Sequence, residues 1–381
     1  MQGTFIETRL GDVCKSNQQT YSPKESWDFV NYLDTGNLTE DRICEIQYIE
    51  VGKDKLPSRA RRKVQEGDIL YSTVRPNQRH YGRIKEVLPN MLVSTGFAVL
   101  TPEKDKLDSD FIYYYLAQAN ITEGLHAIAE QSTSAYPSIK PSDIEGLDIM
   151  LPPLEVQRKI GKTLRTIDDK IENNRKINHH LEQMAQAIFK SWFVDFEPWG
   201  GVMPDNWREG YLGDISTITS GKRPSMREAA ITSEVNVPLI GASSIMGYTN
   251  AVLYNEKILI TGRVGTHGVI QRYSSPCWAS DNTLVIKSDY YEFTYQQLCN
   301  VDFHNMNRGS TQPLITQTDL KNVQVILPDE VTLYEFEEMV GSLMELYEGN
   351  NKESKHLTAL RDTILPRLMS GELSVADLAT K

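Results

Sequence analysis

The chain repeats itself, and this internal duplication restricts its fold more than any other feature. Leu10-Gly11-Asp12 recurs as Leu212-Gly213-Asp214, an offset of 202 residues, whereas the run from Ser134 to Ile188 recurs at an offset of 176. Within the longer run, Leu151-Pro152 corresponds to Leu327-Pro328. The two offsets differ because the globular part of the second half is 26 residues shorter. We therefore expect two copies of one domain, the second with a trimmed loop region.

A long amphipathic helix is predicted after each globular part. Apolar residues recur at alternating spacings of four and three from Ile160 to Trp192, and again from Phe336 to Leu368. Both helices carry an asparagine in the middle, Asn174 in the first and Asn350 in the second. We expect the helices to pair antiparallel, with these asparagines fixing the register. The predicted seam consists of Ile160, Leu164, Ile167, Ile171, Asn174, Leu181, Ile188, Phe336, Val340, Leu343, Tyr347, Asn350, Leu357 and Ile364.

The predicted fold class is α+β. Two globular mixed α/β domains are expected to be separated by two long helices that form an antiparallel coiled coil, with an internal pseudo-twofold repeat. The expected boundaries are 1–152 and 198–328 for the domains, and 153–197 and 329–381 for the helices with the C-terminal tail. Two ordinary amphipathic core helices are the alternative, but the length and matched phase of the two patterns count against it.

Composition and the lack of targeting signals favour a folded protein of the cytoplasm. Hydrophobic residues make up 40% of the 381 residues and charged residues 24%, proportions that argue against disorder. No stretch of eighteen apolar residues and no signal peptide is visible, so neither a membrane span nor secretion is expected. The four cysteines form no Cys-x-x-Cys pair, which fits a reducing cytoplasm.

The sequence offers little support for catalysis. Gly161-Lys162-Thr163 lacks the upstream glycine of a phosphate-binding loop, and it lies within the first predicted helix. Pro328-Asp329 with Glu353-Ser354-Lys355 imitates the order of a nuclease motif, but a solvated helical face explains the second segment better. We therefore predict no catalytic residue, no metal site and no cofactor in this chain.

Polar and basic side chains suited to nucleic acid recur in both halves. The segment from Lys53 to Arg83 contains nine basic and only three acidic residues, although an isolated charge run is usually a solvated loop. Arg, Asn and Gln can read base edges, and two such sets on duplicated domains favour readout of a bipartite DNA site. A spacer of 33 helical residues, about 50 Å, would separate the half-sites by somewhat more than one DNA turn. The candidate contacts are Arg59, Arg61, Arg62, Lys63, Arg75, Asn77, Gln78, Arg79, His80, Tyr81 and Arg83, and then Lys222, Arg223, Ser225, Arg263, Thr266, His267, Arg308, Ser310, Thr311 and Gln312.

Several segments match a known family. They are Leu151–Ile160, which opens the first helix, Ala187–Phe196, which closes it, Pro204-Asp205-Asn206-Trp207, and Leu365–Leu373 near the C-terminus. Over nearly its whole length the chain resembles the specificity (S) subunit of type I restriction-modification systems. The resemblance implies two target recognition domains that read one split double-stranded DNA site, and it adds Ser132, Thr133 and Tyr136 to the candidate contacts.

The resemblance also implies partners and a role in phage defence. Two DNA adenine methyltransferase subunits would dock on the helices, and S-adenosylmethionine and ATP/Mg would be used only by partner subunits. Whether restriction or translocase subunits join them stays open. The second helix opens Leu327-Pro328-Asp329 and lacks both the double proline and the counterpart of Gln157, so we expect its docking to be weaker or different.

Two other classes of function stay open on the residues alone. One is an autonomous DNA methyltransferase or nuclease. The other is a coiled-coil interaction protein without DNA specificity. DNA readout predicts that replacing Arg79 and Arg263 by Ala weakens binding by roughly 1–3 kcal/mol per base contact, and the interaction protein predicts no change.

Overall fold

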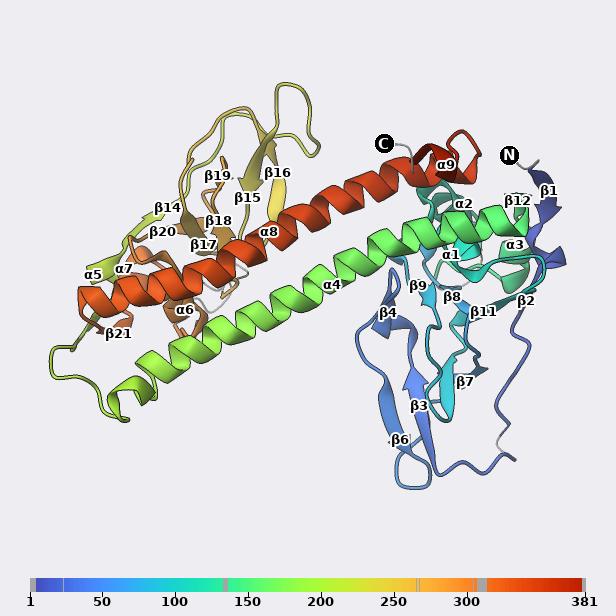
Figure 1. Ribbon diagram of the computed structural model, residues 1–381, viewed down its shortest axis with the longest axis horizontal. Helices are drawn as coiled ribbons and strands as arrows, with labels where there is room; N and C mark the ends of the chain where they lie inside the picture. The colour runs from blue at the N-terminus through green and yellow to red at the C-terminus, as the bar shows by residue number, and fades with distance from the viewer. Residues whose placement is uncertain are drawn as a thin grey trace. The chain divides into compact units, whose positions relative to one another are not determined.

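The computed structural model describes residues 5–22, 24–132, 136–264, 266, 268–303, 305–306 and 314–378 (Figure 1). Contacts divide the chain into unit 1, Met1–Asn173 with Lys352–Lys381, and unit 2, Asn174–Asn351. The two predicted long helices are confirmed as α4 (Leu154–Phe193) and α8 (Glu330–Met369), each of 40 residues. Each helix therefore contributes one half to unit 1 and the other half to unit 2.

Unit 1 is built on two four-stranded sheets. Strands such as β8 (Ile69–Ser72) and β10 (Met91–Ser94) are buried along their whole length, which explains why their sequences show no alternation of apolar and polar residues. The first sheet has the order β2 (Cys14–Ser16), β11 (Phe97–Pro102), β8 (Ile69–Ser72), β9 (Tyr81–Arg83). The second has the order β6 (Gln47–Glu50), β3 (Phe29–Leu33), β10 (Met91–Ser94), β7 (Ala60–Lys63), in which β3 and β10 are parallel. Two small antiparallel pairs complete the strands, β1 (Ile6–Arg9) with β12 (Asp148–Leu151) and β4 (Leu38–Thr39) with β5 (Arg42–Ile43).

Helices cover the first sheet of unit 1 and join it to α4. They are α1 (Ser109–Ala117), α2 (Ala119–Glu130) and α3 (Pro141–Glu145). Their buried apolar side chains share one core cluster with residues of β8 and β11 and with Ile160 and Leu164 of α4. Ile364 and Leu368 of α8 belong to the same cluster. The domain core and the ends of both long helices are thus continuous within unit 1.

Unit 2 repeats this topology in a smaller form. Its sheets have the orders β14 (Thr217–Ser220), β20 (Thr283–Lys287), β17 (Ile258–Gly262), β18 (Gln271–Tyr273), and β16 (Ile245–Thr249), β15 (Val237–Ile240), β19 (Trp278–Ala279). β13 (Arg208–Tyr211) pairs with β21 (Gln324–Leu327), and the helices are α5 (Leu212–Ile215), α6 (Tyr291–Cys299) and α7 (Gln317–Lys321). The parallel pair β15–β19 corresponds to β3–β10. Counterparts of β4, β5 and β7 do not occur among the described strands, and several connections are shorter than in unit 1.

The two long helices contact each other within each unit. In unit 1, Arg361 Nη1 lies 2.8 Å from Asp168 Oδ1. In unit 2, Asn350 Nδ2 donates to Asn178 Oδ1 (2.9 Å), and Asn178 Nδ2 donates to Asn351 Oδ1 (3.0 Å). The predicted Asn174–Asn350 contact is a longer bond of 3.5 Å to the backbone carbonyl of Asn350. Every predicted seam residue is buried or half-buried.

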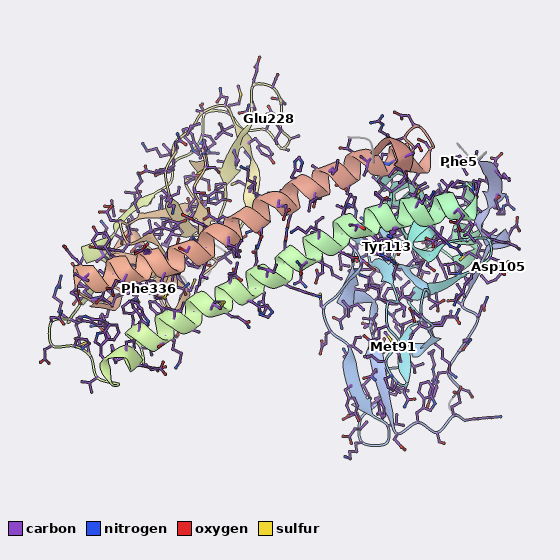
Figure 2. The ribbon with its side chains drawn as sticks, viewed as in Figure 1. Phe5, Met91, Asp105, Tyr113, Glu228 and Phe336 are labelled. Atoms are coloured by element: carbon purple, nitrogen blue, oxygen red, sulfur yellow. The ribbon has the colours of Figure 1, made fainter. Side chains whose placement is uncertain are left out.

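A cluster of aromatic side chains fills the part of unit 2 where the two helices meet the second domain. Phe189 and Phe193 of α4 pack against Phe293 of α6 and Phe336 of α8. Phe336 is labelled in Figure 2. The centroids of the Phe193 and Phe293 rings lie 4.9 Å apart in an edge-to-face contact, an arrangement that aromatic pairs favour. Across the described part of the chain, no helix is long and apolar enough to cross a membrane.

Candidate nucleic-acid interface

Basic residues of unit 2 lie where three neighbouring strands begin or end. In the antiparallel sheet, Ser220 at the end of β14 pairs with Leu284, and Gly262 at the end of β17 pairs with Thr283. Lys222 follows the first strand end, and Arg263 follows the second. Lys222 and Arg223 are exposed, and Arg263 is half-buried. The fold therefore brings together Lys222 and Arg263, which are 41 positions apart in the chain.

The end of β19 and the turn that follows it, residues 280–282, anchor both of these segments. Lys222 N–H donates to the carbonyl of Ala279 (2.9 Å), and Arg263 N–H donates to the carbonyl of Asn282 (2.8 Å). Gly221 permits this close approach, because a Cβ at that position would lie 2.1 Å from the Ser280 carbonyl oxygen. The backbone at Lys222 and at Arg263 is therefore tied to neighbouring strands by hydrogen bonds.

Unit 1 uses the equivalent turn, residues 95–96 between β10 and β11. Thr95 N–H donates to the carbonyl of Arg59 (2.9 Å), and Thr73 N–H donates to the carbonyl of Gly96 (2.8 Å). The exposed Arg59 and the loop that leads from β8 to Arg75 therefore flank one turn. We call these two places, around residues 95–96 and 280–282, the strand-end sites. No sequence pattern marked the turns themselves, because they become central only through the pairing of distant strands.

The Arg75–Arg79 loop has an unusual backbone. Arg75 (φ 48°) and Arg79 (φ 56°) adopt left-handed conformations on either side of the short 3-10 helix Pro76–Gln78. Such conformations are costly for residues with a Cβ and tend to occur at functional sites. Asn77 and Gln78 are exposed between them. The Arg75 guanidinium lies 5.1 Å from the centroid of the Tyr136 ring, so the structure brings together two candidate contacts from separate segments.

Two carboxylates that the sequence did not point to neutralise cations here. Glu40 Oε1 lies 2.8 Å from Arg79 Nη1, and this hydrogen bond raises the pKa of the Arg79 guanidinium. Glu25 lies 2.5 Å from Lys63 Nζ, and the hydrogen bond from Lys63 lowers the pKa of Glu25. His80 is also engaged, because its Nδ1 lies 2.7 Å from the Leu38 carbonyl oxygen. A DNA phosphate or base would have to compete with these partners.

Two predicted DNA contacts are wrong. Tyr81 is 3% exposed and stacks on Tyr71, and Arg83 is 6% exposed. Both Asp41 and Asp110 hold the Arg83 guanidinium through ion pairs of 2.6 Å. Both side chains belong to the domain interior, since β9 begins at Tyr81 and turns them away from solvent.

The remaining candidates are less concentrated. Arg61, Arg62 and Lys63 lie half-buried on β7, and burial lowers the pKa of Arg62. Ser225 and Thr266 are exposed in unit 2, and Ser132 is half-buried in unit 1. The candidates outside the described residues are Thr133, His267, Arg308, Ser310, Thr311 and Gln312. Within the described ranges, no three His, Cys, Asp or Glu side chains gather as a possible metal site.

Two copies of one α/β domain, each with basic side chains around an equivalent turn, define a duplicated DNA-recognition protein. The model of the type I restriction modification DNA specificity domain matches residues 4–183 and 204–335. The chain belongs to this family and has the role of a DNA sequence-specificity subunit with two recognition domains. Subunits of this family are generally non-catalytic.

Relatives align along nearly the whole chain. The type I restriction enzyme HindI specificity subunit of Haemophilus influenzae is 26% identical over 463 residues, which cover 96% of this chain and 99% of that protein. The MjaIX specificity subunit of Methanocaldococcus jannaschii is 25% identical and covers 99% of this chain and 91% of its own length. A solved type I restriction-modification S subunit from M. genitalium shares the fold, with a TM-score of 0.61, 17% identity and 96% of each chain covered.

Proposed function

We propose that the chain reads a split double-stranded DNA sequence, one half-site with each domain, and leaves methylation and cleavage to partner subunits. The recognition domains are assigned to residues 1–152 and 198–328. The observation that carries this proposal is the recurrence of a basic strand-end site in both units, with Arg59 and Arg75 in one and Lys222 and Arg263 in the other. Because Arg can form two hydrogen bonds with a guanine edge, such residues can specify sequence as well as bind phosphate.

The long helices are proposed to pair as an antiparallel coiled coil that sets the gap between the half-sites. The helix contacts support this antiparallel arrangement. Asp168 of α4 forms an ion pair with Arg361 of α8, whereas Asn178, further along α4, bonds Asn350, which lies earlier on α8. Forty helical residues extend about 60 Å. Deleting one heptad from both helices should therefore change the gap and leave both half-sites intact.

The proposed partners are two DNA adenine methyltransferase subunits, with restriction and translocase subunits as a further possibility in a complete complex. S-adenosylmethionine and ATP/Mg would be bound by those chains, all of them in the cytoplasm. The segment 329–381 carries 11 acidic and 5 basic residues, a balance that favours contact with protein over contact with phosphate. The net charge of −11 also favours binding of DNA only after basic partners have joined.

Mapping methylated adenines in cells with and without this chain, with the methyltransferase present in both, tests the proposal. A split motif that depends on the chain is expected. Arg75→Ala and Arg263→Ala should each relax one half-site only, because each removes a base contact of roughly 1–3 kcal/mol from one domain. Arg208→Ala is the matched control, since Arg208 is exposed on β13, outside the sheet that ends at the strand-end site. If methylation is unchanged by the chain although the methyltransferase is active, the proposal is wrong.

Two alternatives predict other results. An autonomous methyltransferase or nuclease would methylate or cleave DNA as the purified chain, and mutation of a specific carboxylate would abolish that activity. A coiled-coil interaction protein without DNA specificity would bind its partner equally well after Arg75→Ala or Arg263→Ala and would leave methylation patterns unaltered.

A further inference from the structure

Each unit contains an arginine with a largely covered side chain, 4% exposed in Arg83 and 9% in Arg272, at the base of the hairpin that carries its strand-end site. In unit 1 the hairpin is β8–β9, its loop holds Arg75, and Arg83 pairs with Ile69 at the other end. In unit 2 the hairpin is β17–β18, Arg263 lies in its loop, and Arg272 pairs with Leu259. The sequence repeat did not single out either buried arginine. Each one is attached to the same rigid two-stranded element as a candidate base contact.

In unit 1 a relay of ion pairs leads from this hairpin to the long helix. The two oxygens of Asp110, near the start of α1, bind two different arginines. Oδ1 accepts from Arg83 Nη1 (2.6 Å), and Oδ2 lies 2.8 Å from Arg165 Nη1 of α4. The Arg83 guanidinium also lies 4.3 Å from the centroid of the Tyr113 ring. Because a guanidinium is planar and donates in fixed directions, these contacts set an orientation as well as a distance.

Unit 2 contains a related relay in which one arginine binds two carboxylates. Glu292 of α6 binds Arg272 through both of its oxygens, at 2.5 and 2.8 Å. Arg272 Nη2 also lies 3.4 Å from Oε1 of Glu348 on α8, and Glu348 Oε2 accepts from Ser274 Oγ (3.2 Å). Tyr291 and Tyr295 stack on the guanidinium with distances to the ring centroids of 4.9 and 4.7 Å. Here Arg272 of the hairpin binds the first helix after the sheet through Glu292, and it binds the long helix α8 directly through Glu348.

We propose that these relays, Arg83–Asp110–Arg165 and Arg272–Glu292/Glu348, are positioning devices that fix the angle of each recognition hairpin on its long helix and thereby restrict the gap length that the protein accepts. This inference rests on the proposed function. The relay residues do not touch DNA bases. Weakening the ion pairs of a relay lets its hairpin reach a half-site that is displaced by one base pair. The accepted gap lengths then change, whereas the base sequence read in each half-site stays the same.

The test uses the complete complex with methyltransferase and maps methylated adenines for Arg165→Ala and Glu348→Ala. Both variants remove the outer, more exposed member of a relay, so the domain core keeps its buried pair. Methylation of sites whose gap is one base pair longer or shorter should rise about fivefold relative to cognate sites, the size expected for one partly exposed ion pair. Arg158→Ala is the control, because Arg158 lies on the same helix as Arg165 but pairs with Glu155 of its own helix.

Arg83→Lys provides a second measurement, since lysine keeps the charge but cannot hold two carboxylates in a fixed plane. A purely structural role would lower methylation at all sites together and produce no new gap lengths. The inference is overturned if the gap stays at its wild-type length in Arg165→Ala, Glu348→Ala and Arg83→Lys. Failure of the proposed function would be visible separately, because the wild-type complex would then give no split motif at all.

Discussion

The two halves join their recognition domain to a long helix by different means. In unit 1, Asp108 caps α1 by accepting from Phe111 N–H (3.0 Å), and Gly161 of α4 lets that helix end approach closely. In unit 2 the residue before α6, Tyr290, provides no side-chain cap. Glu337 of α8 supplies it instead, accepting from the N–H groups of Glu292 (3.0 Å) and Phe293 (2.8 Å).

The repeat offset of 176 relates Gly161 to Glu337, so equivalent positions of the two long helices have different roles. In unit 1 the domain caps its own helix α1, so the long helix α4 needs only a residue without a side chain at the contact. In unit 2 the domain provides no side-chain cap for α6, so the long helix α8 supplies a carboxylate. The contact between the domain helix and the long helix is therefore retained in both halves, although different residues form it. Unit 2 depends more directly on its long helix than unit 1 does.

The largest effect is expected from enlarging Gly161. A Cβ at this position would lie 2.7 Å from Asp110 Cβ and 3.1 Å from the Phe111 backbone nitrogen. Gly161→Glu, which copies the second half into the first, should lower the free energy of unfolding by about 3 kcal/mol because α1 must shift. Urea denaturation measures this. Gly349→Ala on α8 is the control; nothing lies within 4 Å of its Cβ, and it should stabilise by about 0.5–1 kcal/mol. An equal response of both variants would contradict the packing argument.

Gln157 provides a second contrast between the halves. It is 1% exposed, and its side chain bonds the backbone groups of Lys106, Asp108 and Pro152 at 2.9–3.0 Å. Because it is buried and makes these bonds, Gln157 acts as an internal clamp on the loop before α1. Its repeat counterpart is the buried Leu333. Gln157→Leu should cost about 2 kcal/mol of stability, because buried backbone groups lose their partners. Full stability of this variant by thermal unfolding would show that the clamp is dispensable.

Removing the cap tests the dependence of unit 2 on its helix. Glu337→Ala leaves two N–H groups at the start of α6 without their acceptor and should cost about 1–2 kcal/mol. Hydrogen exchange should locate the loss in α6 and spare α1. Asp108→Ala is the matched variant in unit 1, with the reverse pattern expected. If Glu337→Ala destabilises α1 and α6 alike, the two junctions are not independent.

Periodic and repeated features could be predicted from the sequence. The two long helices and the burial of their seam residues follow from spacings that are local to each segment. The strand-end sites could not be predicted, because they depend on the pairing of Gly262 with Thr283 and of Phe97 with Ser72. Arg83 was misassigned for the same reason, since the carboxylates that bury it, Asp41 and Asp110, are distant in sequence. The composition of a basic segment does not distinguish an arginine that faces solvent from one held inside.

The smallest expected effect is a pH dependence confined to the unit 2 junction. Burial raises the pKa of the Glu337 carboxyl to about 7, so in the folded chain it binds a proton at a pH where the unfolded chain does not. A carboxyl with a raised folded pKa stabilises the fold at low pH, and this contribution is lost as the pH rises through 7. Between pH 6 and pH 8, the free energy of unfolding should therefore fall by about 1 kcal/mol more in the wild type than in Glu337→Gln. Urea titrations at the two pH values measure the difference. Equal slopes would mean that the two backbone hydrogen bonds offset the effect of burial and keep the carboxylate ionised.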